Sequence, residues 1–244
     1  IRDGIEIHHD GDLPKMTGLG TSSSFTVGLL HALHVLRGEF RSKMQLAREA
    51  IHVERDRCGD HVGSQDQVCA AFGGLNHIRF APNDEIAVEP VSLPSARLKE
   101  FEDSLLLFFT GFSRYSSDVA GEQLLNISRK QQELSEMAAM VDEGLALLAT
   151  GRDLSDFGRL LHESWRLKRS LSPRVSSPEI DTMYDLALKA GALGGKITGA
   201  GGGGFLLVFV EPDRRQAVRA ALSHLLHVPF DLDHSGSQII FSNP

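Results

Sequence analysis

The chain has 244 residues, enough to bury a substantial core in one large domain or in two lobes of the usual ~100 to 200 residues. With 41% hydrophobic and 23% charged residues it has the composition of an ordinary soluble globular protein, which argues against a disordered or membrane-embedded chain. The formal net charge of -7 repels nucleic-acid phosphates, so it argues against a general DNA or RNA binder, and an anionic ligand would need a local site.

The first part of the chain is predicted to combine short strands with helices. Residues 4–8 are predicted to form a strand, and residues 13–20 a loop. Apolar side chains at helical spacing predict helices at 22–36, 43–57 and 67–72. Residues that favour strands predict β-structure at 76–80 and 85–91. A loop of the size that holds a phosphate group therefore leads directly into the first helix.

The second part is predicted to be mainly helical, with buried strands between the helices. Helices are predicted at 118–148, 153–170, 178–190 and 212–226, and strands at 104–109, 196–198, 205–210 and 237–241. Ser177 and Pro178 stand in the order expected for an N-cap and a first turn. The change from mixed strands to long helices near residue 97 predicts two lobes, 1–96 and 97–244.

A first candidate site is the run Gly18-Leu19-Gly20-Thr21-Ser22-Ser23-Ser24. Glycines permit close backbone approach, and a helix that begins there presents free N–H groups and a partial positive charge to a phosphate. A serine-rich N-cap behind a tight turn would give the same pattern, so both interpretations stay open. No lysine follows the glycines at the spacing of a Walker loop, and the cradle would belong to another class of phosphate site.

A second candidate is the run Lys196-Ile197-Thr198-Gly199-Ala200-Gly201-Gly202-Gly203-Gly204. Three of its glycines formally match GxGxxG, but a dinucleotide fold requires a helix next, and the apolar run 205–210 predicts a strand. A tight hairpin needs only one or two glycines, and additional ones cost conformational entropy. Close approach of this loop to a ligand is the better account.

A third candidate is the acidic pair Glu54 and Asp66. Phosphoryl transfer uses carboxylates in two roles, one holding a metal ion and one orienting or deprotonating the attacking hydroxyl. Two surface charges would look the same in sequence. Asp66 lies among small and apolar residues, so of the two it fits a cleft better.

The cysteines and the basic residues carry weaker signals. Cys58 and Cys69 are too few for a disulfide framework and predict reduced thiols in the cytoplasm, and their spacing from nearby histidines matches no tight zinc pair. No apolar run reaches the ~20 residues of a membrane span, so no membrane partner is expected. The chain is acidic overall but contains a cluster of basic side chains. This cluster is either a solvated helix face or a binding site for a substrate phosphate. Its members are Arg166, Lys168, Arg169 and Arg174, with Arg114 earlier in the chain.

Together the three motifs resemble the GHMP kinase superfamily. They occur in its order, as Pro14-x-x-x-Gly18-Leu19-Gly20-Thr21-Ser22-Ser23, then Gly63-Ser64-Gln65-Asp66-Gln67, then 196–204. The resemblance extends over nearly the whole chain. Residues 181–204, with Leu193-Gly194-Gly195-Lys196, look most like the branch of D-glycero-D-manno-heptose 7-phosphate kinases, which is related to galactokinase and fucokinase-like enzymes.

The resemblance implies an α+β, two-lobed fold that binds ATP and Mg²⁺. Matching positions imply that residues 18–23 hold the ATP phosphates, that Ser22 and Glu54 bind magnesium, and that Asp66 is the base or orienting carboxylate. They imply that the 199–204 loop lines the substrate pocket, so Gly199, Ala200, Gly201 and Gly202 are candidate substrate contacts. The basic cluster adds Arg114 and Lys168 as further candidates. The implied substrate is a sugar or sugar phosphate, and in the heptose branch the acceptor is the anomeric hydroxyl of the 7-phosphate.

The sequence departs from the family pattern at its start. The family has an earlier glycine-rich motif with an arginine, and nothing before Gly18 matches it. We therefore expect an N-terminal lobe that is incomplete in this chain. Other sugar kinases of the family, acting on fucose, galactose or mannose, a decarboxylating member and a catalytically silent ligand-binding homologue stay open as alternatives.

Overall fold

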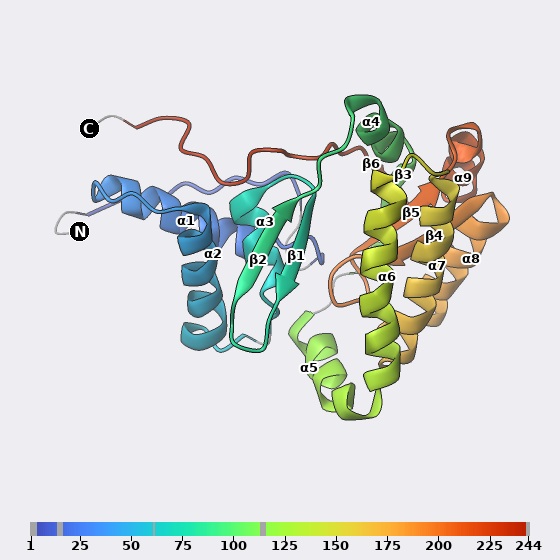
Figure 1. Ribbon diagram of the computed structural model, residues 1–244, viewed down its shortest axis with the longest axis horizontal. Coiled ribbons are helices and arrows are strands. Elements are labelled where there is room, and N and C mark those ends of the chain that lie inside the picture. Colours follow the sequence, from blue (N-terminus) through green and yellow to red (C-terminus); the bar gives the residue numbers. More distant parts are fainter. Residues whose placement is uncertain (1–3, 14–16, 61, 113–115, 243–244) are drawn as a thin grey trace.

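The computed structural model describes residues 4–13, 17–60, 62–112 and 116–242. Its helices and strands form two lobes, which lie side by side in Figure 1. In the described part of the chain the strands form a two-stranded sheet, β1-β2, and a four-stranded sheet of order β4-β5-β3-β6. The predicted α+β class is confirmed, and the predicted lobe boundary at residue 97 falls in the first turn of α4.

The N-terminal lobe consists of three packed helices and one hairpin. Its elements are α1 (Thr21–Leu36), α2 (Lys43–Ile51), a π-helix (His52–Arg57), α3 (Gln65–Phe72), β1 (Asn76–Phe80) and β2 (Ile86–Pro90). Alanine and valine side chains dominate its core, and their small size lets the helices approach closely. Core members are Val27, Leu46, Ala47, Ala50, Ile51, Val68 and Ala71.

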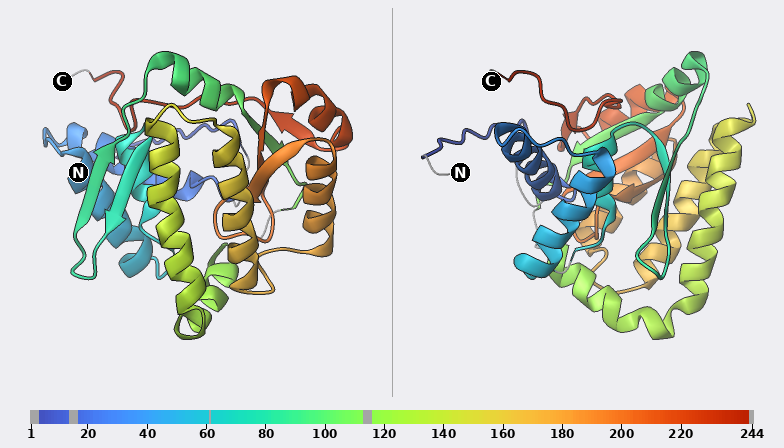
Figure 2. Two further views of the ribbon diagram at one scale, coloured as in Figure 1. Left: turned by 45° about the vertical axis from the view of Figure 1, so that its right-hand side comes forward. Right: turned by 60° about the vertical axis from the view of Figure 1, so that its left-hand side comes forward.

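The C-terminal lobe adds longer helices around the larger sheet. Its helices are α4 (Ser95–Asp103), α5 (Ser116–Asn126), α6 (Gln131–Ala149), α7 (Ser155–Ser170), α8 (Pro178–Lys189) and α9 (Arg215–Ala221), with 3-10 turns at Ile127–Arg129 and Pro212–Arg214. Its strands are β3 (Leu105–Phe109), β4 (Ala192–Ile197), β5 (Phe205–Val210) and β6 (Leu226–Val228). Helices α6 and α7 stand in front of this sheet in the left-hand view of Figure 2.

Both faces of the larger sheet are buried, which explains the continuous apolar runs of β3 and β5. Leu106 and Phe108 of β3 pack with Val208 of β5 against α8 and α9. The alternate residues, Leu105 and Phe209, pack against α4 and the helical pair α6 and α7. Side chains alternate between the two faces along each strand.

Glycines let helix α7 lie directly on strand β4. A Cβ atom added at Gly158 of α7 would lie 2.7 Å from Leu193 Cβ and 2.7 Å from Phe209 Cδ1. A Cβ added at Gly194 of β4 would collide with the Gly158 carbonyl oxygen. Because neither position has room for a side chain, the helix lies close against the sheet at this point.

Several predicted elements differ from the structure. Residues 4–10 form no strand, and the predicted helix 118–148 is split at Lys130, where a 3-10 turn lets α6 fold back onto α7. The predicted helix 212–226 ends at Ala221, because the chain then returns to the sheet as β6. Helix α4 and strand β6 were not predicted.

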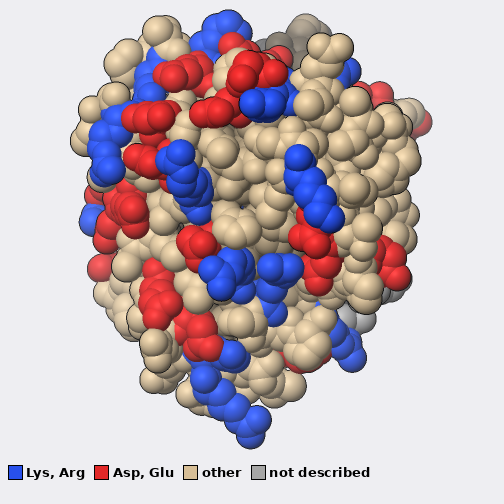
Figure 3. Space-filling view, turned by 90° about the vertical axis from the view of Figure 1, so that its right-hand side faces the viewer, with Lys and Arg blue, Asp and Glu red and all other residues tan. Residues whose placement is uncertain are grey.

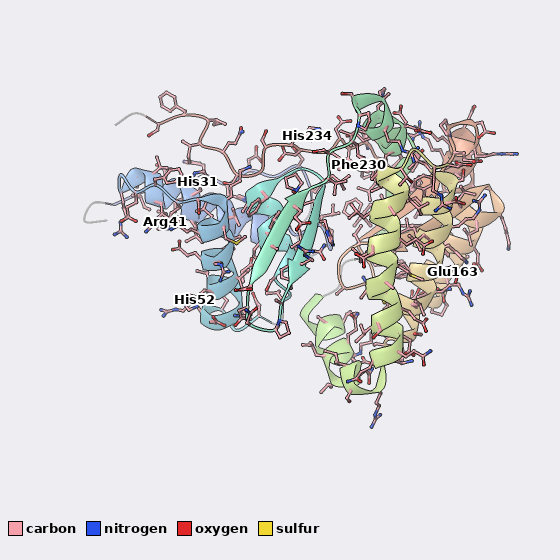
Figure 4. All side chains as sticks on the ribbon, in the orientation of Figure 1. His31, Arg41, His52, Glu163, Phe230 and His234 are labelled. Carbon is pink, nitrogen blue, oxygen red and sulfur yellow. The ribbon has the colours of Figure 1, made fainter. Side chains whose placement is uncertain are left out.

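The predicted last strand, 237–241, is wrong, because this segment pairs with no described strand. Residues 229–242 instead run back over the N-terminal lobe, past His31 of α1, as Figure 4 shows with the labels Phe230 and His234. Lys43 Nζ donates to the carbonyl oxygens of Phe72 and Ser235, each at 2.8 Å. The C-terminal segment therefore joins the two lobes. None of the helices in the described part of the chain combines the length and hydrophobicity needed to traverse a bilayer.

Candidate active site

The two glycine-rich loops predicted to bind phosphate are in contact. Gly18 has φ 75°, and a Cβ atom there would lie 2.8 Å from the Thr198 carbonyl oxygen. Gly199 has φ 63°, and its added Cβ would lie 2.8 Å from Gly18 Cα. The loop between β4 and β5 extends toward the N-terminal lobe in Figure 1 and meets the start of α1. Glycine is required at both positions by conformation and by space.

Helix α1 begins at this contact with an uncapped N-terminus. Its N-cap residue Gly20 is left-handed, with φ 68° and ψ 24°, and no described side chain caps the helix. The first helical hydrogen bond is donated by the Ser24 amide to the Gly20 carbonyl, at 2.9 Å. The N–H groups of the preceding turn, with the helix dipole behind them, form an arrangement suited to an anion.

Glu54 lies behind this helix start and is buried, with only 3% of its surface exposed. Its Oε1 accepts hydrogen bonds from the hydroxyls of Ser22, at 2.8 Å, and Thr26, at 3.0 Å. Its Oε2 accepts from the Ser23 hydroxyl at 2.8 Å and from Gln67 Nε2. A buried carboxylate is tolerated only with such partners, and they fix its position relative to α1.

A change of helical pitch directs Glu54 toward α1. Helix α2 passes without interruption into the π-helix His52–Arg57, in which the Cys58 amide donates to the Val53 carbonyl oxygen five residues back, at 2.9 Å. The predicted helix over 43–57 is thus confirmed in extent, and its last turn is wider than predicted. Such π-turns occur frequently at functional sites.

Asp66 lies in the first turn of α3 and faces Gly20. A Cβ atom added at Gly20 would lie 3.1 Å from Asp66 Cβ and 3.4 Å from its Oδ2. The side chain keeps exposed surface, and surrounding protein atoms displace enough water to raise its pKa, with a further contribution from the charge of Glu54. The charge of Lys168 opposes this rise. The Asp66 carboxylate thus lies beside the N-terminus of α1, which is suited to bind a phosphate, and its affinity for a proton is increased.

Two lysines from the C-terminal lobe complete the group. Lys168 of α7 donates a hydrogen bond from Nζ to the Gly199 carbonyl oxygen. Burial, with the nearby charge of Lys196, lowers the pKa of Lys168 to about 7, while Asp66 acts in the opposite direction. Burial also lowers the pKa of Lys196, on β4. The site therefore combines two carboxylates, Asp66 and Glu54, with two partly desolvated amines.

The structure separates the predicted substrate-binding residues. Gly199 is exposed beside Lys168, whereas the Ala200 carbonyl accepts from Gln123 Nε2 at 2.8 Å within the C-terminal lobe. The Gly202 amide donates to the Val175 carbonyl at 2.8 Å, and Gly201 packs on the same residue. Residues 200–202 of the loop therefore attach it to the C-terminal lobe and do not face the Lys168 side. Predicted residue Arg114 lies outside the described residues.

Most of the predicted basic cluster is paired on the surface. Arg166 pairs with Glu163 at 2.9 Å, Arg169 with Asp181 at 2.9 Å and Arg174 with Glu122 at 2.7 Å. Basic and acidic side chains alternate over the face seen in Figure 3, and Glu163 lies on the outward side of α7 in Figure 4. Of the cluster members on α7, Lys168 is the one that the structure directs to the glycine loop.

Sequence reasoning missed Gln67 and Lys196. Gln67 is fully buried; its Nε2 contacts Glu54, and its Oε1 has no hydrogen-bond partner in the described structure. Both residues stand inside the quoted motifs, and a polar side chain at a buried strand or helix position was the available signal. Their roles depended on which faces of α3 and β4 turn inward, which the sequence alone did not settle.

The residues predicted to hold Mg²⁺ fit that ion in their chemistry. Ser22 and Glu54 are in direct contact and present oxygen atoms, the ligands that this hard cation prefers. No described group of three or more His, Cys, Asp and Glu side chains gathers in a metal-binding arrangement. Magnesium sites with one or two protein ligands take the remaining ligands from water and from phosphate oxygens of a nucleotide.

This fold and this pair of glycine loops define a class of protein. Family models for the GHMP kinase N-terminal and C-terminal domains match residues 1–74 and 144–227. The chain belongs to the GHMP kinase superfamily, which confirms the resemblance seen in its motifs.

Particular relatives include sugar-phosphate kinases. The chain is similar to the D-glycero-alpha-D-manno-heptose 7-phosphate kinase of Campylobacter jejuni, with 32% identity over 224 residues that cover 89% of this chain and 65% of the relative. A crystal structure of a D-glycero-D-manno-heptose 1-phosphate kinase from Bacteroides thetaiotaomicron has 30% identity and a TM-score of 0.70, covering 95% of this chain and 66% of that one. Galactokinase of Pyrococcus furiosus is 28% identical over 247 residues, which cover 90% of this chain and 68% of the relative. The chain thus spans about two thirds of the length of these relatives.

Proposed function

We propose that the chain carries the catalytic centre of an ATP-dependent sugar kinase, and that its substrate is D-glycero-D-manno-heptose 7-phosphate, phosphorylated at the anomeric hydroxyl. In this proposal residues 1–96 form the ATP-binding lobe and residues 97–244 the second lobe. Residues 18–23 bind the ATP phosphates, and Gly199 with Lys168 lies against the reacting groups. The heptose-phosphate kinases among the relatives support this choice of substrate.

One observation carries the proposal. Gly18 and Gly199 bring the two loops into contact, and Asp66 lies against Gly20 at the uncapped start of α1. A phosphate chain on the helix N-terminus and a hydroxyl beside Asp66 would therefore be neighbours. Such positioning is the main requirement of phosphoryl transfer.

The reaction is a direct in-line transfer. The anomeric hydroxyl gives its proton to an Asp66 carboxylate oxygen while its own oxygen forms a bond to the γ-phosphorus of ATP. The bond from that phosphorus to the β,γ-bridging oxygen breaks, and ADP leaves with the electron pair. The raised pKa of Asp66 favours proton acceptance. The helix N–H groups and Lys168 stabilise negative charge on the phosphoryl group.

Ser22 and Glu54 would hold Mg²⁺, which neutralises charge on the ATP phosphates when it is bound. Glu54 is prepared for this role, because Ser23 and Gln67 hold its Oε2 while its Oε1 shares the contacts of Ser22 and Thr26. Ser22 on the first turn of α1 and Glu54 on the π-helix therefore lie next to the amides that would bind the phosphates.

Asp66→Asn tests the proposal. The amide is nearly isosteric but accepts no proton at neutral pH, so turnover should fall by roughly 10²- to 10⁴-fold. Binding of a non-hydrolysable ATP analogue should change little, because that affinity depends on the helix start. Steady-state kinetics and calorimetric titration measure the two quantities. Wild-type turnover in Asp66→Asn would remove this residue from the reaction.

The acceptor is identified by a substrate panel. The chain, and the same chain extended to the length of its relatives, would be incubated with ATP and heptose 7-phosphate, mannose, fucose or galactose. We expect transfer to heptose 7-phosphate. Transfer to an unphosphorylated sugar alone would favour a fucokinase-like or galactokinase-like activity, and carbon dioxide release would indicate a decarboxylating member of the family. Binding of ATP without transfer to any acceptor would indicate a catalytically silent homologue.

A further inference from the structure

Lys196 has no partner among the residues that the structure describes, although its neighbours on both sides are part of the core. Ile197 is fully buried, and Gly195 lies so close to β5 that a Cβ atom there would be 2.5 Å from the Leu207 carbonyl oxygen. Lys196 itself is half-buried, and its ammonium group makes no hydrogen bond or ion pair with any described residue. The buried and unpaired side-chain atoms of the described residues do not include the Lys196 ammonium nitrogen, so this group reaches solvent and is free to bind a ligand, although burial lowers its pKa.

The register of the sheet directs Lys196 toward helix α7. Lys196 stands opposite Leu207 of β5 in the antiparallel pair β4-β5. Directly opposed residues lie on the same face of a sheet, and Leu207 packs on the face covered by α7. Gly194, two residues earlier on β4, contacts the Gly158 carbonyl of α7. The Lys196 side chain thus enters the region next to the C-terminal half of α7.

Lys168 is the cation that meets Lys196 there. Its Nζ donates to the carbonyl oxygen of Gly199, which follows Lys196 closely along the chain, and the charge of Lys196 contributes to the lowered pKa of Lys168. Asp66 is the acidic group that acts on Lys168. Asp66 therefore faces two cations, while the carboxylate of Glu54, which also acts on Asp66, is held by four hydrogen-bond donors of the protein.

We propose that Lys168 and Lys196 together form a binding site for a phosphoryl dianion beside Asp66. Each lysine supplies N–H donors. A doubly charged anion balances two positive charges better than a singly charged carboxylate does. The site rests on the proposed function and deepens it, since it assigns Lys196 to the binding of a phosphoryl group in the same centre.

The position of the site favours the group that is transferred. Lys168 binds Gly199, and Gly199 contacts Gly18 at the start of α1, where the ATP phosphates would lie. The γ-phosphoryl of ATP is therefore the expected occupant. The phosphate already present on a sugar-phosphate acceptor has the same chemistry, and the experiment separates the two sources.

The test compares ligands that differ by one phosphoryl group. Calorimetry would measure ADP against the ATP analogue AMPPNP, and heptose 7-phosphate against the unphosphorylated heptose, for wild type, Lys196→Met, Lys168→Met and Lys196→Arg. The exposed Lys189→Met, on α8, is the matched control. We expect Lys196→Met to weaken AMPPNP by about 10- to 100-fold with ADP unchanged, as expected for loss of a charged hydrogen bond. Lys196→Arg should retain most of the affinity.

Each outcome decides the proposal. A loss confined to heptose 7-phosphate also supports the dianion site and assigns it to the acceptor. Equal affinities of Lys196→Met and wild type for all four ligands would overturn it. Lys196→Gln replaces Lys196→Met if that variant fails to fold, as judged by thermal unfolding. If ligand binding depends on Lys196 but no sugar is phosphorylated, the kinase activity is rejected and the dianion site stands. If Lys196→Met phosphorylates the sugar at the wild-type rate and binds all four ligands as wild type does, the kinase activity stands and the dianion site is rejected.

Discussion

Glu54 illustrates how a single carboxylate is positioned through its neighbours. Hydroxyl groups from two successive turns of α1 and an amide from α3 all donate to it, and it is almost completely buried. Removing one donor from a buried acceptor leaves part of its desolvation cost uncompensated. The stability of the N-terminal lobe is therefore coupled to the same residue that would bind the metal ion.

Ser23→Ala should destabilise the protein. Glu54 Oε2 would lose a buried donor, and the free energy of unfolding should fall by about 1 to 3 kcal/mol. Ser24→Ala, at the adjacent exposed position, is the control and should change it by less than about 0.5 kcal/mol. Urea denaturation of both variants measures the difference. Equal stabilities of the two variants would show that the Ser23 contact contributes nothing.

Lys168 predicts a pH dependence of stability. Its pKa is about 7 in the folded protein and 10.5 for an ordinary lysine, so between these values the unfolded chain holds a proton that the folded chain has released. The free energy of unfolding should therefore rise with pH across this window. Lys168→Met should reduce that rise, measured by denaturation at pH 7, 8 and 9, while Lys189→Met should not. An unchanged slope in Lys168→Met would contradict the lowered pKa.

At the scale of elements, the contact between the two glycine loops determines the site. Gly18→Ala places a Cβ atom against the Thr198 carbonyl and forces a left-handed conformation on alanine, which costs roughly 1 to 2 kcal/mol. We expect lower stability and at least tenfold weaker binding of an ATP analogue, because the loops must separate. Denaturation and calorimetry measure the two effects.

Gly28→Ala is the control within the same helix. An added Cβ at Gly28 meets no atom within 4 Å, and alanine in the interior of a helix is favoured over glycine by about 0.5 to 1 kcal/mol. This variant should be slightly more stable than wild type and should bind the analogue normally. If both variants lost affinity equally, the contact between the loops would not be the cause.

Most elements could be predicted from the sequence, because their signals are local. Apolar spacing gave α1 and the apolar run gave β5, and Ser177 caps α8 as predicted, accepting from the Ile180 amide at 3.4 Å. The strand predicted at 196–198 overlaps only the end of β4, which begins at Ala192. The turn at Lys130 and the strand β6 follow from packing against distant residues and have no local signal. In the site, the sequence predicted Asp66 and Glu54, and both lie near the start of α1. Lys196 depends on the register of β4 against β5, which only the folded chain defines.

At the scale of the molecule, the C-terminal segment joins the lobes. Gly74 and Lys43 in the N-terminal lobe bind the backbone of Asp233 and Ser235, and Leu232 donates to Glu102 of the other lobe at 3.3 Å. The two halves of the proposed site are thus held together by a strap as well as by the loops. Its loss would leave fewer connections across the site.

Lys43→Met should loosen this strap. The variant loses the ammonium group that connects the Phe72 and Ser235 carbonyls, so the amides of residues 231–237 and of Gly74 should exchange hydrogen about tenfold faster. Exchange in the core of the larger sheet should stay as in wild type. Hydrogen-exchange mass spectrometry measures both, and unaltered protection of 231–237 would show that the strap does not depend on Lys43.

The π-helical turn at His52–Arg57 does not tolerate the insertion or deletion of a residue. Each residue of an α-helix advances the next side chain by about 100° around the axis, because one turn takes 3.6 residues. Deleting one residue from this turn would restore the ordinary winding and rotate Glu54 away from Ser22 and Ser23. Surface loops accept insertions and deletions, but this turn does not. A change of one residue here would move the Glu54 carboxylate out of line with Ser22 and Ser23.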